Sequence, residues 1–518
     1  MAFRQTISSN GTNLHIVEEP LPGILPSELT VPETNNWLQL EPNSYDDFGQ
    51  ELELVARQPL SEDRQQKKGV IVGADVMAGF NNDLTSTEAI KAMIGGFLFA
   101  ETRAKKHYLA TAVTSTGYTV ASDGDDMVAG DLIFVKGSPI AANNGLKVVG
   151  ASSTGTEIKV GGLTADSCDV EIWHVGFQFA SGDAVLDTTV NLLPAMTTTT
   201  KDLTTLGLVP GEIVFLGGDG AGQRFAGANN SGWCRVKSVA AGRLTFDKTD
   251  YEMTDDAGTG LLIRIFFGDV IKNETGSAIK RRTFCVQRSL GKPDLDNPTL
   301  PQADYVRKAI CNELTINIGE KEIVNLDFGL IPGEYDVRTT VQGLLAGNYQ
   351  VLPEVDAFNS SGDIKMERLA VYPAAGSNTS APSPLFALIQ ETEITINNNA
   401  EGINAHRYVG YVEIVEGMFE FGGSITAYFA TVDAITAVKQ NKDTTYAMAS
   451  YKNNAGWAVD MPMISLGNGM LDLAPNEAIK IDIDLQASTG AKYDTTMNHT
   501  GLFVFFNYLP AFADRRVD

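Results

Sequence analysis

The sequence is poor in cysteine and histidine, and the few residues of both kinds are scattered. It holds four cysteines and five histidines in 518 residues. No two cysteines stand in a C-x-x-C pair, which excludes the usual zinc spacing and the disulfide framework of small secreted domains. We therefore expect no metal site. The cysteines are expected to be reduced thiols in the protein core, at Cys168, Cys234, Cys285 and Cys311.

Long apolar runs are also missing. No stretch approaches the ~20 apolar residues that a membrane-spanning helix needs. The first six residues are not followed by the apolar core of a secretory signal. The sequence alone therefore predicts a soluble protein that is made in the cytoplasm and has no membrane partner.

Positive charge is in short supply. There are 39 Lys and Arg against 64 Asp and Glu, for a net charge of −25. A surface of this sign repels a phosphate backbone, which argues against a grip on DNA through basic side chains. Two interpretations stay open: the acidic surface serves solubility alone, or it lines a passage that DNA crosses without sticking.

Glycine and proline are plentiful and dispersed, with 50 and 20 residues, which favours an all-β protein with many turns. One β-rich passage occurs twice. Asn-Gly and Ser-Gly steps in it supply the positive φ angles of tight hairpins. Each copy has a strand, an Asn-rich turn and a second strand, at 128–135, 143–145 and 147–149 and again at 209–216, 229–233 and 235–237. We predict two small tandem β modules, over 112–185 and 186–258.

The flanks of the modules have a different texture. Four prolines punctuate residues 1–36, which predicts an extended arm. Thr85 and Glu88 form a capping box before an apolar stretch, so we predict a helix that ends at Gly95 and Gly96.

A second internal similarity links the two flanks. The strand at 69–80 and the helix behind it are echoed by a strand at 417–429 and a helical stretch at 432–438. Chance likeness of two amphipathic strands is an equal alternative. We predict an all-β fold with one or two short helices, built on a duplicated β-sandwich or barrel frame. Its two domains are 37–111 with 259–305, and 306–518.

The candidate chemical motifs are weak. The glycine-rich loop at 217–223 lacks the Gly-Lys-Ser/Thr of a phosphate-binding loop, and no helix follows it. The acidic turn at 123–126 lacks the spaced ligands of a calcium loop. We therefore expect neither an enzyme nor a cofactor.

The order of parts resembles a family of tail tube proteins of long-tailed bacteriophages. The matching pieces are the arm with Val17–Glu19 and Leu21–Pro26, Ser61–Gln65, the strand from Gly69 to Phe80, the helix to Gly96, Gly130-Asp131, Asn143–Gly145, Val148-Val149, Leu314–Ile316, Gly417–Phe429 and Trp457. The second copy of the module departs from the family pattern. The resemblance implies a structural virion protein, whose rings stack into a hollow tube for genome delivery, with the frame domains as two tube domains.

We place hypothetical sites on this resemblance. The arm and the following loop are expected to make contacts between rings, through Glu18, Glu19, Pro22, Gly23, Asp63 and Arg64. Acidic strand residues are expected to face the lumen, at Glu413, Glu416 and Glu420. The modules are expected to project outside the tube.

The expected partners are copies of the chain, the tape-measure protein, and the tail terminator and tail-tip proteins. Genome DNA would pass without specific binding. By resemblance, six tube units surround the axis, so a duplicated chain would form rings of three subunits, and an unduplicated one rings of six. The alternative functions are another virion part, such as a tail-tip, terminator or head-decoration protein, or a tail fibre that binds or degrades glycans.

Overall fold

The structure is a computed structural model of the chain. It describes residues 9–30, 33–58, 65, 67–189, 193–291, 301–338, 343–373, 381–386, 388–408, 410–473 and 475–515. These residues are mostly β, with two α-helices, and their sheets stay open and form no closed barrel. The predicted all-β fold with short helices is therefore confirmed.

The chain divides into two compact units. The first unit comprises Met1–Ala100, Gly276–Phe358 and Thr392–Gly423, and the second comprises Glu101–Thr275, Asn359–Glu391 and Ser424–Asp518. Each unit is thus assembled from segments that lie far apart in the sequence.

The first unit holds one helix, α1 (Glu88–Phe97), on a frame of strands. These strands are β1 (Asn13–Glu19), β2 (Asn36–Leu40), β3 (Pro42–Ala56), β4 (Gly69–Asp83), β18 (Thr283–Ser289), β19 (Ala303–Ile318), β20 (Asn325–Ile331), β21 (Glu334–Arg338), β22 (Asn348–Gln350), β26 (Glu401–Ile403) and β27 (Glu413–Val415). Strands β25 (Ile389–Asn397) and β28 (Glu420–Tyr428) contribute residues to both units.

The second unit holds helix α2 (Asp433–Lys439) and two groups of strands. The module strands are β5 (His107–Val113), β6 (Gly117–Val120), β7 (Asp131–Lys136), β8 (Gly145–Val148), β9 (Glu157–Lys159), β10 (Val170–Gln178), β11 (Val185–Asp187), β12 (Ala195–Thr197), β13 (Ile213–Leu216), β14 (Gly232–Ala240), β15 (Arg243–Thr249) and β16 (Arg264–Phe266). The frame strands are β17 (Asp269–Lys272), β23 (Ile364–Val371), β24 (Ser383–Pro384), β29 (Thr444–Lys452), β30 (Ala455–Asp472), β31 (Lys480–Ser488) and β32 (Leu502–Phe506).

Part of the predicted arm is a core strand. Strand β1 pairs antiparallel with β18 and with β2, and Leu14 and Ile16 are fully buried between its neighbours. Three of the four prolines that predicted an extended arm lie directly after this strand, at 20, 22 and 26, so they do not interrupt its ladder, and Pro32 lies outside the described residues. The segment therefore has a hydrophobic core of its own to join.

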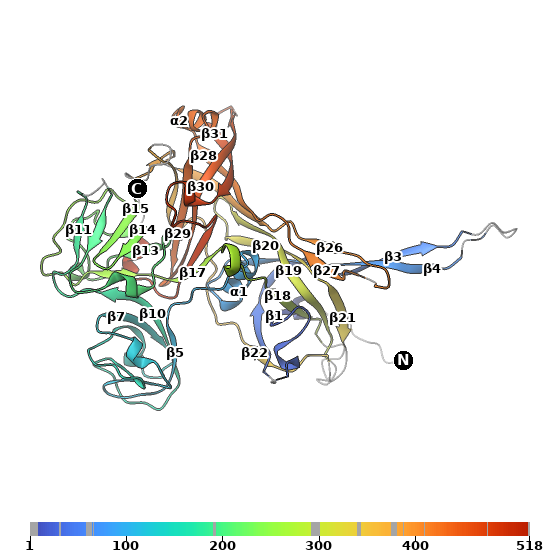
Figure 1. Cartoon of the computed structure of the whole chain (residues 1–518), viewed down its shortest axis with the longest axis horizontal. Helices are drawn as coiled ribbons and strands as arrows, with labels where there is room; N and C mark the ends of the chain where they lie inside the picture. The colour runs from blue at the N-terminus through green and yellow to red at the C-terminus, as the bar shows by residue number, and fades with distance from the viewer. Residues whose placement is uncertain are drawn as a thin grey trace. The chain divides into compact units, whose positions relative to one another are not determined.

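Strands β3 and β4 form a long hairpin that extends away from β1, β18 and β19 of the same unit (Figure 1). From Ala74 to Asn82, every second residue of β4 is buried, as expected for a strand with one face on the core. From Gly69 to Gly73 no residue is buried, and none is buried in β3. The outer half of the hairpin has therefore left the core.

Both predicted helices are present, but α1 begins differently from the prediction. Its N-cap is Thr87, and the predicted capping residue Thr85 instead contacts the Thr87 hydroxyl at 3.3 Å. At the other end, the buried Asn398 amide donates to the Phe97 carbonyl, 2.9 Å away. This side chain satisfies one of the carbonyls that a helix C-terminus leaves without a partner.

The repeated passage forms corresponding hairpins, β7 with β8 and β13 with β14. Gly130 and Gly211 both have a positive φ, at 94° and 91°. The acid after each glycine, Asp131 or Glu212, accepts a hydrogen bond from the backbone N–H three residues before it. The repeat thus includes the acid-capped turn that starts each hairpin.

The two modules share one sheet. Strand β16, in the segment 259–305 assigned from sequence to the frame, pairs with β10 of the first module and β13 of the second. The first module has its own core around Tyr118, Ile133 and Ile172. The second has a core around Phe225, Phe246 and Ile265.

We expect Leu14→Ala to lower the free energy of unfolding by about 2–5 kcal/mol, because it leaves a cavity in a buried strand. The matched control is Leu21→Ala, at a side chain that is 54% exposed, with an expected effect within about 0.5 kcal/mol. Scanning calorimetry measures both. Equal effects of the two substitutions would show that β1 is not part of the core.

Candidate functional site

A buried ion network lies in the second unit. Arg235 Nη2 lies 2.6 Å from Asp247 Oδ2, and Arg235 Nη1 lies 3.0 Å from Asp460 Oδ1. Lys248 Nζ lies 3.1 Å from the same Asp460 oxygen. Arg235, Asp247 and Asp460 have no exposed side-chain surface, so two positive and two negative charges balance each other away from water.

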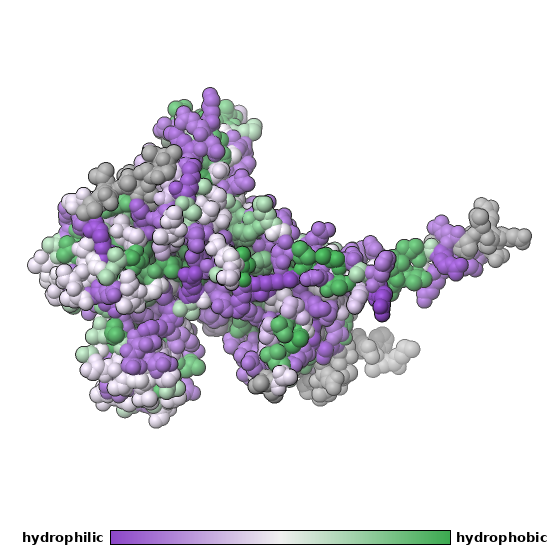
Figure 2. Space-filling model, viewed as in Figure 1, coloured by the Kyte–Doolittle hydropathy of each residue, from purple (hydrophilic) through white to green (hydrophobic). Residues whose placement is uncertain are grey.

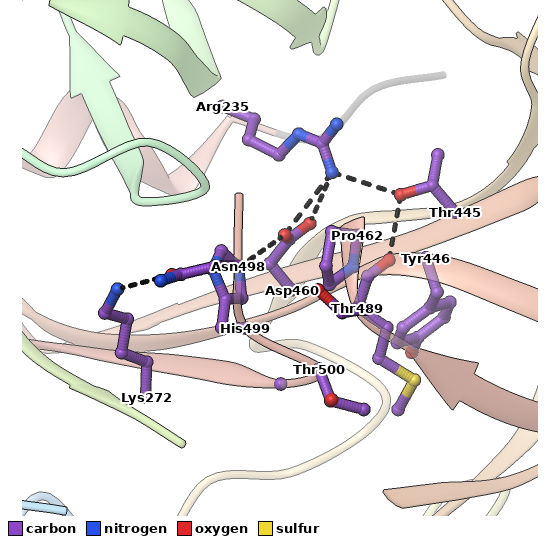
Figure 3. Close-up of polar contacts among 12 residues, drawn as sticks. Arg235, Lys272, Thr445, Tyr446, Asp460, Pro462, Thr489, Asn498, His499 and Thr500 are labelled. Carbon is purple, nitrogen blue, oxygen red and sulfur yellow. Dashed lines mark hydrogen bonds and ion pairs between the residues drawn. The ribbon is translucent and has the colours of Figure 1, made fainter. Parts of the chain in front are cut away.

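Neutral groups complete this network. Arg235 donates to the Thr445 hydroxyl at 3.1 Å and to the Tyr372 hydroxyl at 3.0 Å, and Tyr372 donates to the Pro462 carbonyl at 2.7 Å. His499 lies with Nε2 3.6 Å from Asp460 (Figure 3). Burial lowers the pKa of His499, so its ring is uncharged at neutral pH.

The pKa values in the network follow from burial and charge. Burial alone would raise the pKa of Asp460, but the charges of Arg235 and Lys248 lower it below its usual range. Burial, followed by the charge of Arg235, lowers the pKa of Lys248 to about 8. Asp460 and Lys248 stay ionised because each of the two charges has a partner of opposite charge within hydrogen-bonding distance.

The network joins the second module to the frame of its unit. Arg235 is on β14 and Asp247 and Lys248 are on β15, whereas Asp460 is on β30. Beside it, the module residues Ile213, Phe215 and Trp233 share a core with Ala458 and Phe506 of the frame. Since its charges are closed to solvent, we assign the network a structural role and no catalytic one.

Across the described ranges, no three His, Cys, Asp or Glu side chains are grouped so that they could hold a metal ion. In the same part of the chain, no helix is long and apolar enough to cross a bilayer.

Cys234, Cys285 and Cys311 are buried free thiols, and Cys168 is half-buried.

The four arm residues proposed for ring contacts lie in the first unit, and Glu18, Glu19 and Gly23 make hydrogen bonds within the chain. Buried Glu19 accepts from the N–H groups of Gly23, at 2.7 Å, and Lys308, at 3.1 Å. Glu18 Oε1 accepts from Arg282 Nε at 2.9 Å. A Cβ at Gly23, where φ is 78°, would come within 2.7 Å of the Lys308 side chain. Asp63 and Arg64 lie outside the described residues.

A cavity of about 300 Å³ brings two of the predicted regions together. Pro22 of the arm and Glu413 of β27 both line it, along with Arg281, Lys308 and Tyr411. Lys308 Nζ lies 2.6 Å from Glu334, so this cation already has a partner. The sequence analysis had assigned Pro22 and Glu413 to two different surfaces.

The three acidic residues predicted to face the lumen differ in their surroundings. Glu413 and Glu420 are exposed. Glu416 is half-buried, and its carboxylate lies 2.5 Å from Arg281 Nε. Only the first two therefore present a free-standing negative charge to solvent in this chain.

The sequence analysis missed the apolar outer half of the β3–β4 hairpin. In Figure 2 the hairpin carries hydrophobic patches along its length. Large alkyl side chains there are between 46% and 64% exposed: Leu52, Leu54, Val55, Val70, Ile71 and Val72. A two-stranded ribbon of this kind is marginally stable alone, and a contiguous apolar patch marks a surface for another molecule. The sequence patterns at 52–55 and 70–80 predicted the two strands. They did not show whether another layer of the protein covers these strands.

The described residues thus form a β-rich protein in which the outer half of the β3–β4 hairpin exposes apolar side chains. A family model described as phage tail tube protein matches residues 9–456. The chain belongs to this family, which confirms the resemblance and makes it a structural protein of the phage tail, a virion component. No curated protein matches the chain.

Burial raises the pKa of Asp250, beside the network, to about 7, although its Oδ2 accepts from Trp233 N–H at 2.7 Å. An acid with a raised pKa in the folded state stabilises at low pH and loses that contribution as pH rises toward 7. We therefore expect Asp250→Asn to be more favourable, relative to the unchanged protein, at pH 8 than at pH 5, by about 2–3 kcal/mol.

Urea unfolding at the two pH values measures this difference. The matched control is Asp472→Asn, which removes an exposed carboxyl of the same unit. A pH-independent effect of Asp250→Asn would contradict the raised pKa.

Proposed function

We propose that copies of this chain assemble into rings, and that the rings stack into the hollow tail tube through which phage DNA passes. The observation that carries the proposal is the exposed apolar hairpin β3–β4 in a chain of the tail tube family. Full burial of one Leu or Val side chain contributes about 1.5–3 kcal/mol. A neighbouring subunit that covers several of them would stabilise both the hairpin and the assembly.

Electron microscopy of the purified protein tests the assembly directly. Long tubes with a regular ring repeat are the expected result. A protein that stays monomeric or trimeric under all conditions would contradict the proposal, and the function of another virion part would then be favoured. We infer no enzymatic activity, because the family is a structural one.

The outer half of the hairpin should be essential to polymerisation. Leu54→Lys places a charge on the surface to be buried, so we expect tubes to be lost, or to need at least tenfold more protein, while the subunit keeps its circular dichroism spectrum. The matched control is Leu109→Lys on β5, because the two leucines are 64% and 63% exposed. Normal tubes from Leu54→Lys would exclude this part of the hairpin from the contact.

We propose that the outer half of this hairpin, with the connecting residues Asp63 and Arg64, makes the contact between rings together with the arm at Glu18–Gly23. Within the arm, Glu19 would act by fixing the turn through Gly23 N–H, and Pro22 would present the surface. Deleting residues 1–30 removes β1, so a truncation tests folding as well as contact. Substitution of Pro22 separates the two.

An acidic lumen at Glu413 and Glu420 would repel passing DNA and keep it from sticking. We expect the double substitution Glu413→Lys with Glu420→Lys to slow triggered DNA release from phage particles several-fold. The control is Glu171→Lys, at an exposed carboxylate on β10. Release that is equally fast in both variants would remove these residues from the lumen. Glu416 is left out, because it is paired with Arg281.

We further propose that the chain is a duplicated tube unit and that three chains form a ring, the alternative being six undivided subunits. A strand followed by a helix, β4–α1 and β28–α2, supports the duplication. The modules would project outside the tube. The tape-measure, terminator and tip proteins are the expected partners in the tail.

A further inference from the structure

The frame repeats a ladder of five strands. The first ladder joins β18, β19, β20, β4 and β3 in that order. The second joins β29, β30, β31, β28 and β25. In chain order, a helix follows β4 in the first and β28 in the second. Strand β25 is therefore the counterpart of β3.

The longest strands of the two ladders correspond in detail. Strand β19 pairs with β18 through its first half and with β20 through its second half, and β30 pairs with β29 and then β31 in the same way. A register shift interrupts each first pairing just before the second begins, beside Lys308 in β19 and at Pro462 and Met463 in β30. Such bulges bend a strand, so both strands turn at equivalent points.

The two strands differ at one edge. The second half of β19 carries β20 on one edge and residues 392–397 of β25 on the other, from Glu313 opposite Asn397 to Ile318 opposite Thr392. The second half of β30, residues 463–472, pairs with β31. Within the described residues, no strand is recorded in register with the other edge of this half of β30. Met470 on this half is 72% exposed.

We infer that strand β3 of a second copy pairs with this edge of β30. The inference rests on the proposed assembly into rings and names the strands that join one subunit to the next. The repeat identifies the strand that covers this edge. Strand β25 covers the equivalent edge of β19, and the counterpart of β25 in the other ladder is β3. Every residue of β3 is exposed or half-exposed, and its register is with β4.

This pairing explains how the liability of long free edges is removed. An uncovered strand edge exposes unpaired N–H and C=O groups that recruit further strands. Because β3 and β30 are different surfaces, each copy offers one and accepts the other, and such head-to-tail contacts form a ring when the rotation between copies closes. The new ladder should be antiparallel, like that of β19 with β25.

Disulfide trapping in assembled tubes tests the strand pair. Met470→Cys is combined with a cysteine placed in turn at each non-glycine position from Asn43 to Glu51 of β3. A disulfide needs Cα atoms within about 7 Å, and side chains alternate along a strand. We therefore expect cross-links between copies at one or two positions of one face only, and the mass of the closed covalent ring gives the number of chains.

The control pairs Met470→Cys with Leu109→Cys on β5, which should stay uncross-linked. Tubes of normal appearance without a cross-link at any β3 position would overturn the inference and leave the proposed function standing. If the unchanged protein forms no tubes, the proposed function fails first. Cross-linking at every position alike would indicate random collision, and would also overturn the strand pair.

Discussion

The requirement that every strand edge find a hydrogen-bonding partner governs this frame. In the first unit, β1 covers one edge of β18, and residues 392–397 cover the second half of β19. The first of these pairings joins segments more than 250 residues apart in the chain, and the second needs residues up to 397, so the unit forms only after most of the sequence is available. Where the chain has no further strand of its own to offer, another copy can supply it.

The second module adds a different constraint. With Arg235 and Lys248 both on Asp460, loss of the module would leave a buried carboxylate without cations, which is far more costly than losing a surface ion pair. The module is therefore part of the folded unit even though it was inserted as a repeat. The first module has its own core around Tyr118, and its residues Leu132 and Val175 also pack into the core that the frame shares with the second module.

Local signals in the sequence predicted local structure well. The Asn-rich turns of the repeated passage located the β7–β8 and β13–β14 hairpins, and an apolar helical stretch located α1, because these patterns depend on neighbours in the chain. The capping box at Thr85 failed, since Thr87 occupies the cap. No local sequence pattern predicted that Arg235 contacts Asp460, which lies 225 positions later in the chain. The exposed hairpin was equally hidden, because alternation reports a strand but not what lies on either face.

The burial of three thiols affects how the protein withstands oxidation over time. Burial raises the pKa values of Cys234, Cys285 and Cys311, so each remains the protonated and less reactive form at neutral pH. Oxidation proceeds through the thiolate and needs access for the oxidant. Three of the four sulfur atoms are therefore shielded from oxidants in water, which leaves the half-buried Cys168 as the thiol with the most access to them.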